Sequence, residues 1–401
     1  MAILFGSGKK LFTDDGIPYM WQSGDVTTTP NEVGIITASD GAANDYFGYS
    51  VAVGSGRIVV GAYRNDVGIN TNQGAAYIFD LNGNQLGILT ASDGAADDAF
   101  GHSVAVGSGR IVVSAPFNDV GSNNNQGSAY IFDLNGNEVG IITASDGTNF
   151  DSFGYSVAVG CGKIVVGAYV DNSYQGSAYI FDLDGNEVGI LTASDGASMD
   201  RFGYSVAVGS GRIVVGAYRN DVGSNNANQG SAYIFDLDGN EVGIITASDG
   251  AANDYFGYSV AVGCGKVVVG AYRNDVGINT NQGAAYIFDL NGNQLGILTA
   301  SDGAAYDTFG SSVAVGSGRI VVGAYGNSAQ ESAYIFDLDG NQLGIITASD
   351  GAADDKFGSS VVAGSGRIVV GAYLNDGNGS AYIYDTPLVY NFYDAIDLNY
   401  E

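Results

Sequence analysis

The sequence predicts an all-β protein, a seven-bladed β-propeller with four-stranded antiparallel blades. A Phe-Gly pair recurs about every fifty residues, and such a period is typical of a repeat architecture. Each copy carries four short apolar runs, and four strands in each of seven units match the layout of a propeller. No stretch shows a helical stripe, and 63 glycines among 401 residues disfavour helices. The Phe-Gly pairs begin at Phe47, Phe100, Phe153, Phe202, Phe256, Phe309 and Phe357.

The four runs of a copy have the patterns of a four-stranded meander. In the first run, residues 47–53, large and small side chains alternate, which predicts a strand whose thin face lies near the crowded axis. The second run, residues 58–63, is apolar on both faces, as expected for a strand between neighbouring blades. Residues 75–80 and 85–90 complete the unit.

Turn residues indicate how the runs connect. Asn-Gly or Asp-Gly between the third and fourth runs favours a two-residue hairpin, and Gly-Ser-Gly or Gly-Cys-Gly joins the first two runs tightly. The remaining connections, such as residues 64–74 and 38–46, are longer and polar. In a meander both long connections emerge on the same face. We therefore expect one face of tight hairpins and one face of long loops.

The seventh unit lacks a fourth run, and a matching run stands ahead of the first unit at residues 31–37. We expect this N-terminal strand to complete the last blade and close the ring, which removes free sheet edges. Burial of Val33, Ile35 and Ile36 is expected to stabilise the closure by about 1.5–3 kcal/mol each. The predicted organisation is an N-terminal arm (1–30), a propeller (31–385) and an aromatic C-terminal tail (386–401).

The repeated segment resembles a known family. Residues 47–54, followed by Val-Val-Gly-Ala-Tyr at 59–63, resemble the FG-GAP repeat, whose pattern runs from Phe-Gly to Gly-Ala-Pro. The second copy comes closest, with Ser114-Ala115-Pro116, and the others replace Pro with Tyr. The resemblance covers residues 31–385 and implies the seven-bladed propeller found at the head of integrin α-subunits. Similar repeats occur in bacterial surface proteins, a few enzymes and phage proteins, so the resemblance implies a fold rather than one function.

Calcium-binding members of that family carry an Asp-x-Asp-x-Asp-Gly loop in the first hairpin, where this chain has Gly54-Ser55-Gly56 and its equivalents. We therefore expect those calcium sites to be absent, and no cofactor. Two other Asp sets recur in every copy and could contribute oxygen ligands to calcium, but we favour turn residues that bond their own backbone. The sets are Asp40, Asp93, Asp146, Asp195, Asp249, Asp302 and Asp350, and Asp45, Asp98, Asp151, Asp200, Asp254, Asp307 and Asp355.

Differences between the copies indicate candidate binding residues. Units one, two, four and five have a longer second loop, and three of these loops begin with Arg in a chain that has only 14 Lys and Arg. Exposed loops that mix Arg, Asn, Asp and aromatic residues suit sugar or protein recognition. The alternative is that each Arg pairs with the neighbouring Asp and holds the loop. The candidates are Arg64, Asn65, Asp66, Phe117, Asn118, Asp119, Arg219, Asn220, Asp221, Arg273, Asn274 and Asp275.

Composition excludes several classes of function. The net charge of −29 disfavours nucleic acid, which requires clustered Lys and Arg, and no apolar stretch is long enough for membrane insertion. The sole histidine, His102, has no catalytic or zinc-ligating partner motif and reads as a strand residue. Carboxylate pairs recur in every blade, whereas an active site is normally singular. We therefore expect no enzyme, and we expect Cys161 and Cys264, on blades that are not neighbours, to be free thiols.

The ends of the chain bear on its setting. Residues 1–5 form too short an apolar run for a signal peptide, which favours a phage virion component over an exported protein. We expect a non-enzymatic tail or capsid-surface protein that contributes to assembly or to recognition of a host protein or glycan. The alternative is a bacterial extracellular or cell-surface adhesion protein, and a carbohydrate-active enzyme is the least favoured hypothesis. The arms contain aromatic residues that could dock on other virion proteins or pack on the propeller, namely Phe5, Phe12, Tyr19, Trp21, Tyr390, Phe392, Tyr393 and Tyr400.

Overall fold

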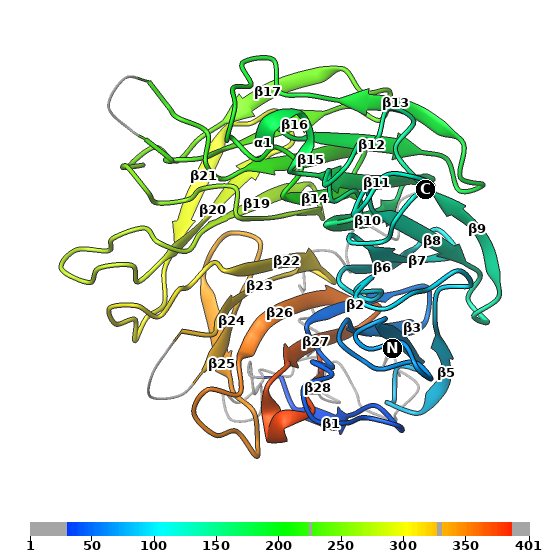
Figure 1. Ribbon diagram of the computed structural model, residues 1–401. Helices are drawn as coiled ribbons and strands as arrows, with labels where there is room; N and C mark the ends of the chain where they lie inside the picture. Colours follow the sequence, from blue (N-terminus) through cyan, green and yellow to red (C-terminus); the bar gives the residue numbers. More distant parts are fainter. Residues whose placement is uncertain (1–29, 224–226, 327–330, 387–401) are drawn as a thin grey trace, which may run out of the picture. The chain divides into compact units, whose positions relative to one another are not determined.

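The computed structural model describes residues 30–223, 227–326 and 331–386, and in these residues the strands form seven four-stranded antiparallel sheets arranged around one axis (Figure 1). The predicted all-β propeller is confirmed. Blade one consists of β2 (Ser50–Gly54), β3 (Arg57–Ala62), β4 (Ala75–Phe79) and β5 (Gln85–Leu89), from the inner to the outer edge. Its strands pair in simple order, with one register shift between Ile78 and Phe79.

Blades two to six repeat this order. They are built from β6 (Val104–Gly107), β7 (Arg110–Ala115), β8 (Ser128–Phe132) and β9 (Glu138–Ile142); β10 (Ser156–Gly160), β11 (Lys163–Ala168), β12 (Ser177–Phe181) and β13 (Glu187–Leu191); β14 (Ser205–Gly209), β15 (Arg212–Ala217), β16 (Ser231–Phe235) and β17 (Glu241–Ile245); β18 (Ser259–Gly263), β19 (Lys266–Ala271), β20 (Ala284–Asp289) and β21 (Gln294–Leu298); and β22 (Ser312–Gly316), β23 (Arg319–Ala324), β24 (Ser332–Phe336) and β25 (Gln342–Ile346). Two helical turns, α1 (Asp171–Tyr174) and η1 (Asn375–Gly377), occupy the shortened loops of blades three and seven. No helix in the described residues is long and apolar enough to cross a membrane.

The ring closes between its first and last strands, as the sequence predicts. Blade seven combines β26 (Phe357–Gly364), β27 (Arg367–Ala372) and β28 (Ser380–Asp385) with β1 (Glu32–Ile36), which pairs antiparallel with β28. Figure 1 shows β1, in blue, against β28, in red. The inner strand β2 also contacts both β6 and β26. The sheet order and the contacts of the inner strands therefore join all seven blades into one closed ring.

The expectation that three side chains of β1 would be buried is wrong for two of them. Ile36 is 4% exposed, but Val33 and Ile35 are 42% and 39% exposed. The reason is geometric: β1 is the outermost strand of its blade, so alternate side chains face solvent instead of a neighbouring sheet. The apolar contribution of β1 to closure therefore comes mainly from Ile36.

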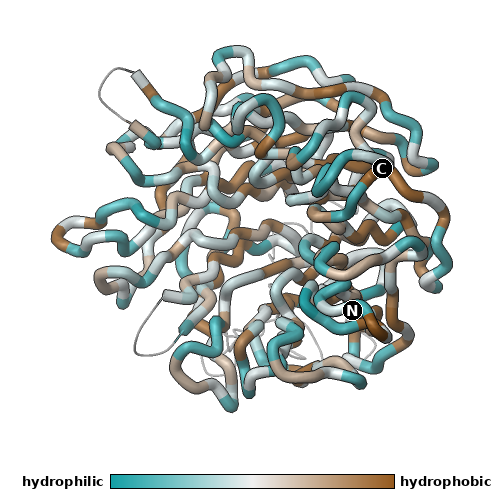
Figure 2. Tube along the Cα trace, in the orientation of Figure 1, coloured by the Kyte–Doolittle hydropathy of each residue, from teal (hydrophilic) through white to brown (hydrophobic). Residues whose placement is uncertain are grey.

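The core lies between blades rather than within them. At the junction of blades one and two, Ile78 and Leu89 pack with Phe100, Ile111 and Tyr130 in one buried cluster. Figure 2 shows hydrophobic residues along the strands and hydrophilic residues in many of the connecting loops. Since each cluster needs two blades, the hydrophobic effect favours the assembled ring over separate sheets.

The Phe-Gly pair joins each blade to the one before it. Phe100 is fully buried, its ring lies 5.3 Å from that of Tyr130, and its N–H donates to the carbonyl of Gln73 in blade one (2.8 Å). Gly101 has φ +91, and a Cβ on it would lie 2.3 Å from the carbonyl oxygen of Ala75. The motif recurs because a large ring fills the junction while a residue without a side chain lets the backbones meet.

The two faces of the ring differ as expected. The hairpins between the first and second strands form the hairpin face, where Asp385 N donates to Asn31 O (3.0 Å) and Thr386 N to Gly366 O (3.3 Å). Both ends of the described ring therefore lie at the hairpin face. The connections between the second and third strands and between successive blades form the loop face. The predicted aromatic arms, apart from Pro30 and Thr386, lie outside the described residues.

Candidate binding face

A buried polar network supports each long loop, and blade one shows its parts. Asn65 Nδ2 donates to Asp45 Oδ2 (3.1 Å) and to the Tyr77 hydroxyl (3.2 Å), which in turn donates to Asp40 Oδ1 (2.9 Å). Asp45 Oδ2 also accepts the N–H of Ala42 (2.7 Å). Burial raises the pKa of the Asp45 carboxyl. Burial and the hydrogen bond to Asp40 together raise the pKa of the Tyr77 hydroxyl. Asp45 holds its own turn, as we predicted, whereas Asp40 accepts the hydroxyl of Tyr77.

The four candidate asparagines belong to this network. Asn65, Asn118, Asn220 and Asn274 are each 5% exposed and donate to the buried Asp of their own blade. The sequence suggested them as ligand contacts because they stand beside exposed residues. In the structure they lie beneath the surface and hold the loop in place.

The four candidate aspartates are exposed, and they bond to their own loops rather than to the arginines that neighbour three of them. Asp66 Oδ1 accepts the N–H of Asn72 (2.9 Å), and the other three aspartates accept the equivalent bond. Between the described residues Arg64 and Asp66 the structure has no ion pair. The equivalent acceptors are Asp119, Asp221 and Asp275.

The candidate arginines instead lie over tyrosine rings. The Arg64 guanidinium carbon is 4.7 Å from the ring centre of Tyr46 and 5.6 Å from that of Tyr63. Arg273 lies 4.9 Å from Tyr255 in the same way. Such cation–π contacts stabilise exposed sites by about 0.5–1 kcal/mol each. These contacts hold each arginine at the loop face, where its guanidinium group lies against tyrosine rings.

Arg201, which precedes the Phe-Gly pair of blade four, is a further loop-face arginine that was not among the predicted residues. Its guanidinium carbon lies 5.4 Å from the ring centre of Tyr169 and 5.5 Å from that of Tyr218, and its Nη1 donates to the Tyr218 hydroxyl (2.5 Å). Arg219 lies over the same Tyr218 ring at 5.6 Å. The signal was present, because this position varies strongly between copies. Arg201 lies outside the second loops, which contain the predicted arginines.

A cluster of aromatic rings surrounds the axis at the loop face, and we call it the axial cluster. It consists of the residue that follows Phe-Gly in five successive blades, with neighbouring ring centres 4.7–5.3 Å apart, whereas blades six and seven have Ser311 and Ser359 there. Burial raises the pKa of Tyr155 to about 12, so its hydroxyl stays protonated and can donate a hydrogen bond. The candidate Phe117 (37% exposed) also contacts this cluster, 6.4 Å from the His102 ring. The members are Tyr49, His102, Tyr155, Tyr204 and Tyr258.

His102 supplies a pH-dependent test of the axial cluster. It lies just before β6, and burial lowers its pKa to about 4, while its Nδ1 is 3.2 Å from the carbonyl of Tyr155. Because the unfolded chain binds this proton more readily, stability should fall by on the order of 2 kcal/mol as the pH drops from 7 to 4.5. Urea unfolding of the wild type and of His102→Tyr at both pH values checks this. The variant has the tyrosine found at this position in four other blades, and its stability should lose this part of the pH dependence. If wild type and variant showed the same pH dependence of stability, the role of His102 would be contradicted.

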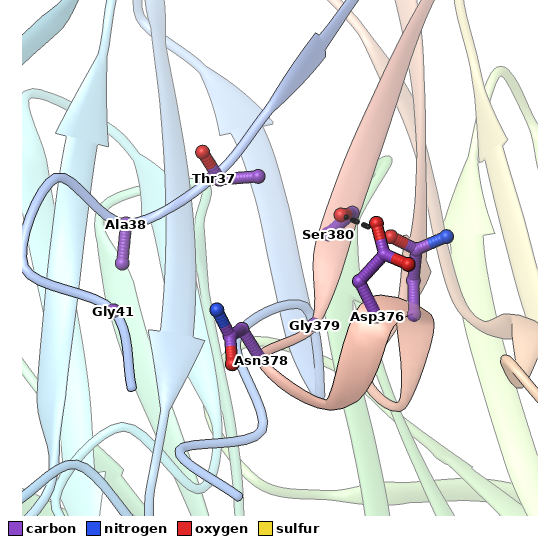
Figure 3. Close-up of a pocket in the computed structure, with 8 residues that line it drawn as sticks. Thr37, Ala38, Gly41, Asp376, Asn378, Gly379 and Ser380 are labelled. Carbon is purple, nitrogen blue, oxygen red and sulfur yellow. Dashed lines mark hydrogen bonds between the residues drawn. The ribbon is translucent and has the colours of Figure 1, made fainter. Parts of the chain in front are cut away.

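The two best-formed hollows among the described residues are smaller than a typical small-molecule site. The one in Figure 3 lies in blade seven between the β1–β2 and β27–β28 loops, where Asn378 and Gly41 line a volume of about 160 Å³. Small-molecule pockets usually occupy about 300–1,000 Å³. No group of three His, Cys, Asp or Glu side chains placed to hold a metal occurs in the described part of the chain. The candidate arginines and aspartates are instead spread over the loops of several blades.

Comparison with known proteins matches the geometry of the ring. The family model described as FG-GAP repeat matches the chain seven times, at residues 30–79, 84–132, 137–181, 186–235, 240–288, 293–336 and 341–384. The first match runs from β1 of blade seven to β4 of blade one, so a sequence repeat is offset from a blade by one strand. No curated protein matches the chain.

Proposed function

The chain belongs to the FG-GAP repeat family, and we propose that its propeller is a non-enzymatic recognition module that binds a partner through the loop face. The observation that carries this proposal is the placement of Arg64, Arg201, Arg219 and Arg273 over partly buried tyrosines. Tyr and Arg are enriched at binding hot spots because they combine large contact area with directional hydrogen bonds.

The ends of the described ring support recognition through the loop face. The described ring begins and ends at the hairpin face. Segments attached there can anchor the module to a larger assembly and leave the loop face free. We propose the surface of a phage particle as that assembly, with residues 1–29 and 387–401 as the attachment segments and a host-surface protein or glycan as the ligand.

Binding to intact candidate host cells tests the proposal. The exposed Cys161 and Cys264 lie in hairpins, so a fluorescent maleimide labels the face away from the proposed site. The variant Arg64→Ala/Arg219→Ala/Arg273→Ala is expected to lower cell binding at least tenfold and the melting temperature by only a few degrees, since each cation–π contact stabilises the fold by about 0.5–1 kcal/mol.

The control removes charge from the other face. Lys163→Ala/Lys266→Ala deletes two positive charges beside the hairpins and should leave cell binding unchanged. Equal binding by the wild type and the arginine variant would contradict the proposal. An equal loss of cell binding in both variants would show that binding depends on the overall charge of the protein.

A further inference from the structure

Resting on this proposed recognition role, we propose that blade four contains an anion subsite, formed by Arg201, Arg219 and Tyr218. Its ligand is the carboxylate or sulfate group of an acidic saccharide. The subsite is distinct from the other positively charged positions of the ring, and its residues come from two loops that meet over one tyrosine.

Most other cations of the ring have structural partners. On the hairpin face an arginine at the start of the second strand donates its Nε to a leucine carbonyl of the next blade, as Arg57 does to Leu134 (3.2 Å). The same bond is made by Arg110 to Leu183, Arg212 to Leu290 and Arg367 to Leu81. These hydrogen bonds join the hairpins of neighbouring blades, so these arginine side chains have a structural role.

Lys356 is the informative comparison on the loop face. It occupies in blade seven the position that Arg201 occupies in blade four, immediately before Phe-Gly. Its Nζ forms ion pairs with Asp354 (3.1 Å) and with the buried Glu331 (3.5 Å). Arg201 and Arg219 form no ion pair with any described residue. In blade seven two carboxylates therefore balance the charge of Lys356. In blade four no carboxylate of the described residues pairs with Arg201 or Arg219.

Burial makes this lack of compensation costly. The Nε atoms of Arg201 and Arg219 are both buried, and neither has a hydrogen-bond partner among the described residues. The nearest carboxylate in sequence, Asp200, is 4% exposed and accepts instead from the Ala197 N–H (2.7 Å) and Asn220 Nδ2 (3.2 Å). Two partly desolvated guanidinium groups that share one ring would be stabilised by an anion, and guanidinium groups pair well with planar or tetrahedral oxyanions.

The surroundings favour a saccharide as the carrier of that anion. Tyr169, Tyr174 and Tyr218 all lie within 6 Å of the Arg201 guanidinium carbon, and Tyr174 is 37% exposed. Tyrosines present both a ring face and a hydroxyl group, which suits the C–H faces and hydroxyls of a sugar. The net charge of −29 repels polyanions in general, so retention of an acidic polymer requires a local site.

The test compares four polymers by biolayer interferometry on the full-length protein: polygalacturonate, dextran sulfate, neutral dextran and poly-glutamate. We expect one or both acidic polysaccharides to bind, and the one that binds identifies carboxylate or sulfate as the group. We expect Arg201→Gln/Arg219→Gln to weaken this binding at least tenfold. Lys163→Gln/Lys266→Gln, which removes two positive charges from the hairpin face, is the matched control and should leave the affinity within twofold.

Several results would overturn the proposal. Unchanged binding in the arginine double variant would place the anion elsewhere, and an equal loss in Lys163→Gln/Lys266→Gln would indicate diffuse electrostatics. Equal binding of dextran would remove the requirement for an acid, and equal binding of poly-glutamate would make the ligand an acidic peptide. If no acidic polysaccharide binds while host-cell binding still depends on the loop-face arginines, the anion subsite is wrong and the recognition role stands.

Discussion

Deletion of residues 31–38 is expected to open the ring and lower the melting temperature by about 10 °C. The deletion removes β1, which is the fourth strand of blade seven and pairs with β28 through Ile35–Tyr382 and Ile36–Ala381. The deletion exposes the edge of β28 and the surface that Ile36, 4% exposed, covers. The lost burial and backbone hydrogen bonds should lower the free energy of unfolding by about 3–5 kcal/mol. Differential scanning calorimetry of the full-length and deleted chains measures the change.

Single substitutions in β1 separate closure from general damage. Ile36→Ala should cost about 2–4 kcal/mol because its side chain is buried against the last blade. Val33→Thr, on the solvent side of the same strand, should change stability by less than about 0.5 kcal/mol. An unchanged melting temperature in the deletion, or equal effects of the two substitutions, would contradict closure by β1.

The second large effect is expected for Gly74→Ala, at the end of the long loop of blade one. Gly74 has φ +88, and a Cβ on it would lie 2.0 Å from the carbonyl oxygen of Phe100 in the next blade. Neither backbone can retreat without breaking the hydrogen bond from Phe100 N to Gln73 O. Strain and overpacking together should destabilise the protein by about 2–5 kcal/mol, measured by urea unfolding.

Gly68→Ala in the same loop is the matched control. Gly68 also has positive φ, +64, but nothing lies within 4 Å of its added Cβ. It should therefore cost only the backbone strain, about 1 kcal/mol. If the two variants were equally stable, close approach between blades would not be the reason for glycine at position 74.

Blade six shows how the ring accommodates a side chain at this position. The equivalent of Gly74 is Glu331, and there Phe357 N donates to Glu331 Oε2 (2.7 Å). The carboxylate accepts this N–H and Lys356 compensates its charge. An alanine at position 74 provides neither group, which is why we expect a large effect.

The sequence predicted the fold almost completely because its signals are local and repeated. The period placed the blades, and Asn-Gly turns such as Asn82-Gly83 placed the hairpins. The displaced fourth run predicted β1 in blade seven. The burial of Val33 and Ile35 was predicted wrongly because an apolar run does not reveal that its strand is the outermost one.

The candidate site was harder to predict because it depends on contacts between loops. The Arg-Asn-Asp pattern placed Arg64, Asn65 and Asp66 in one candidate site. The structure shows that Asn65 is buried and bonded to Tyr77, whereas Arg64 and Asp66 are exposed. Arg201 was missed because it approaches Arg219 through folding, from a different connection in the same blade. The axial cluster likewise forms from residues about fifty positions apart, which no local window brings together.

The orientation of the bound module tests loop-face recognition most directly. One sample is attached to a surface through the native Cys161 and Cys264 at the hairpin face, and the other, Cys161→Ser/Cys264→Ser/Ile69→Cys, through a loop tip where Ile69 is 98% exposed. Cells that bind the free protein should be captured by the hairpin-attached sample and not by the loop-attached one. Equal capture by both, or capture by the loop-attached sample alone, would contradict recognition through the loop face.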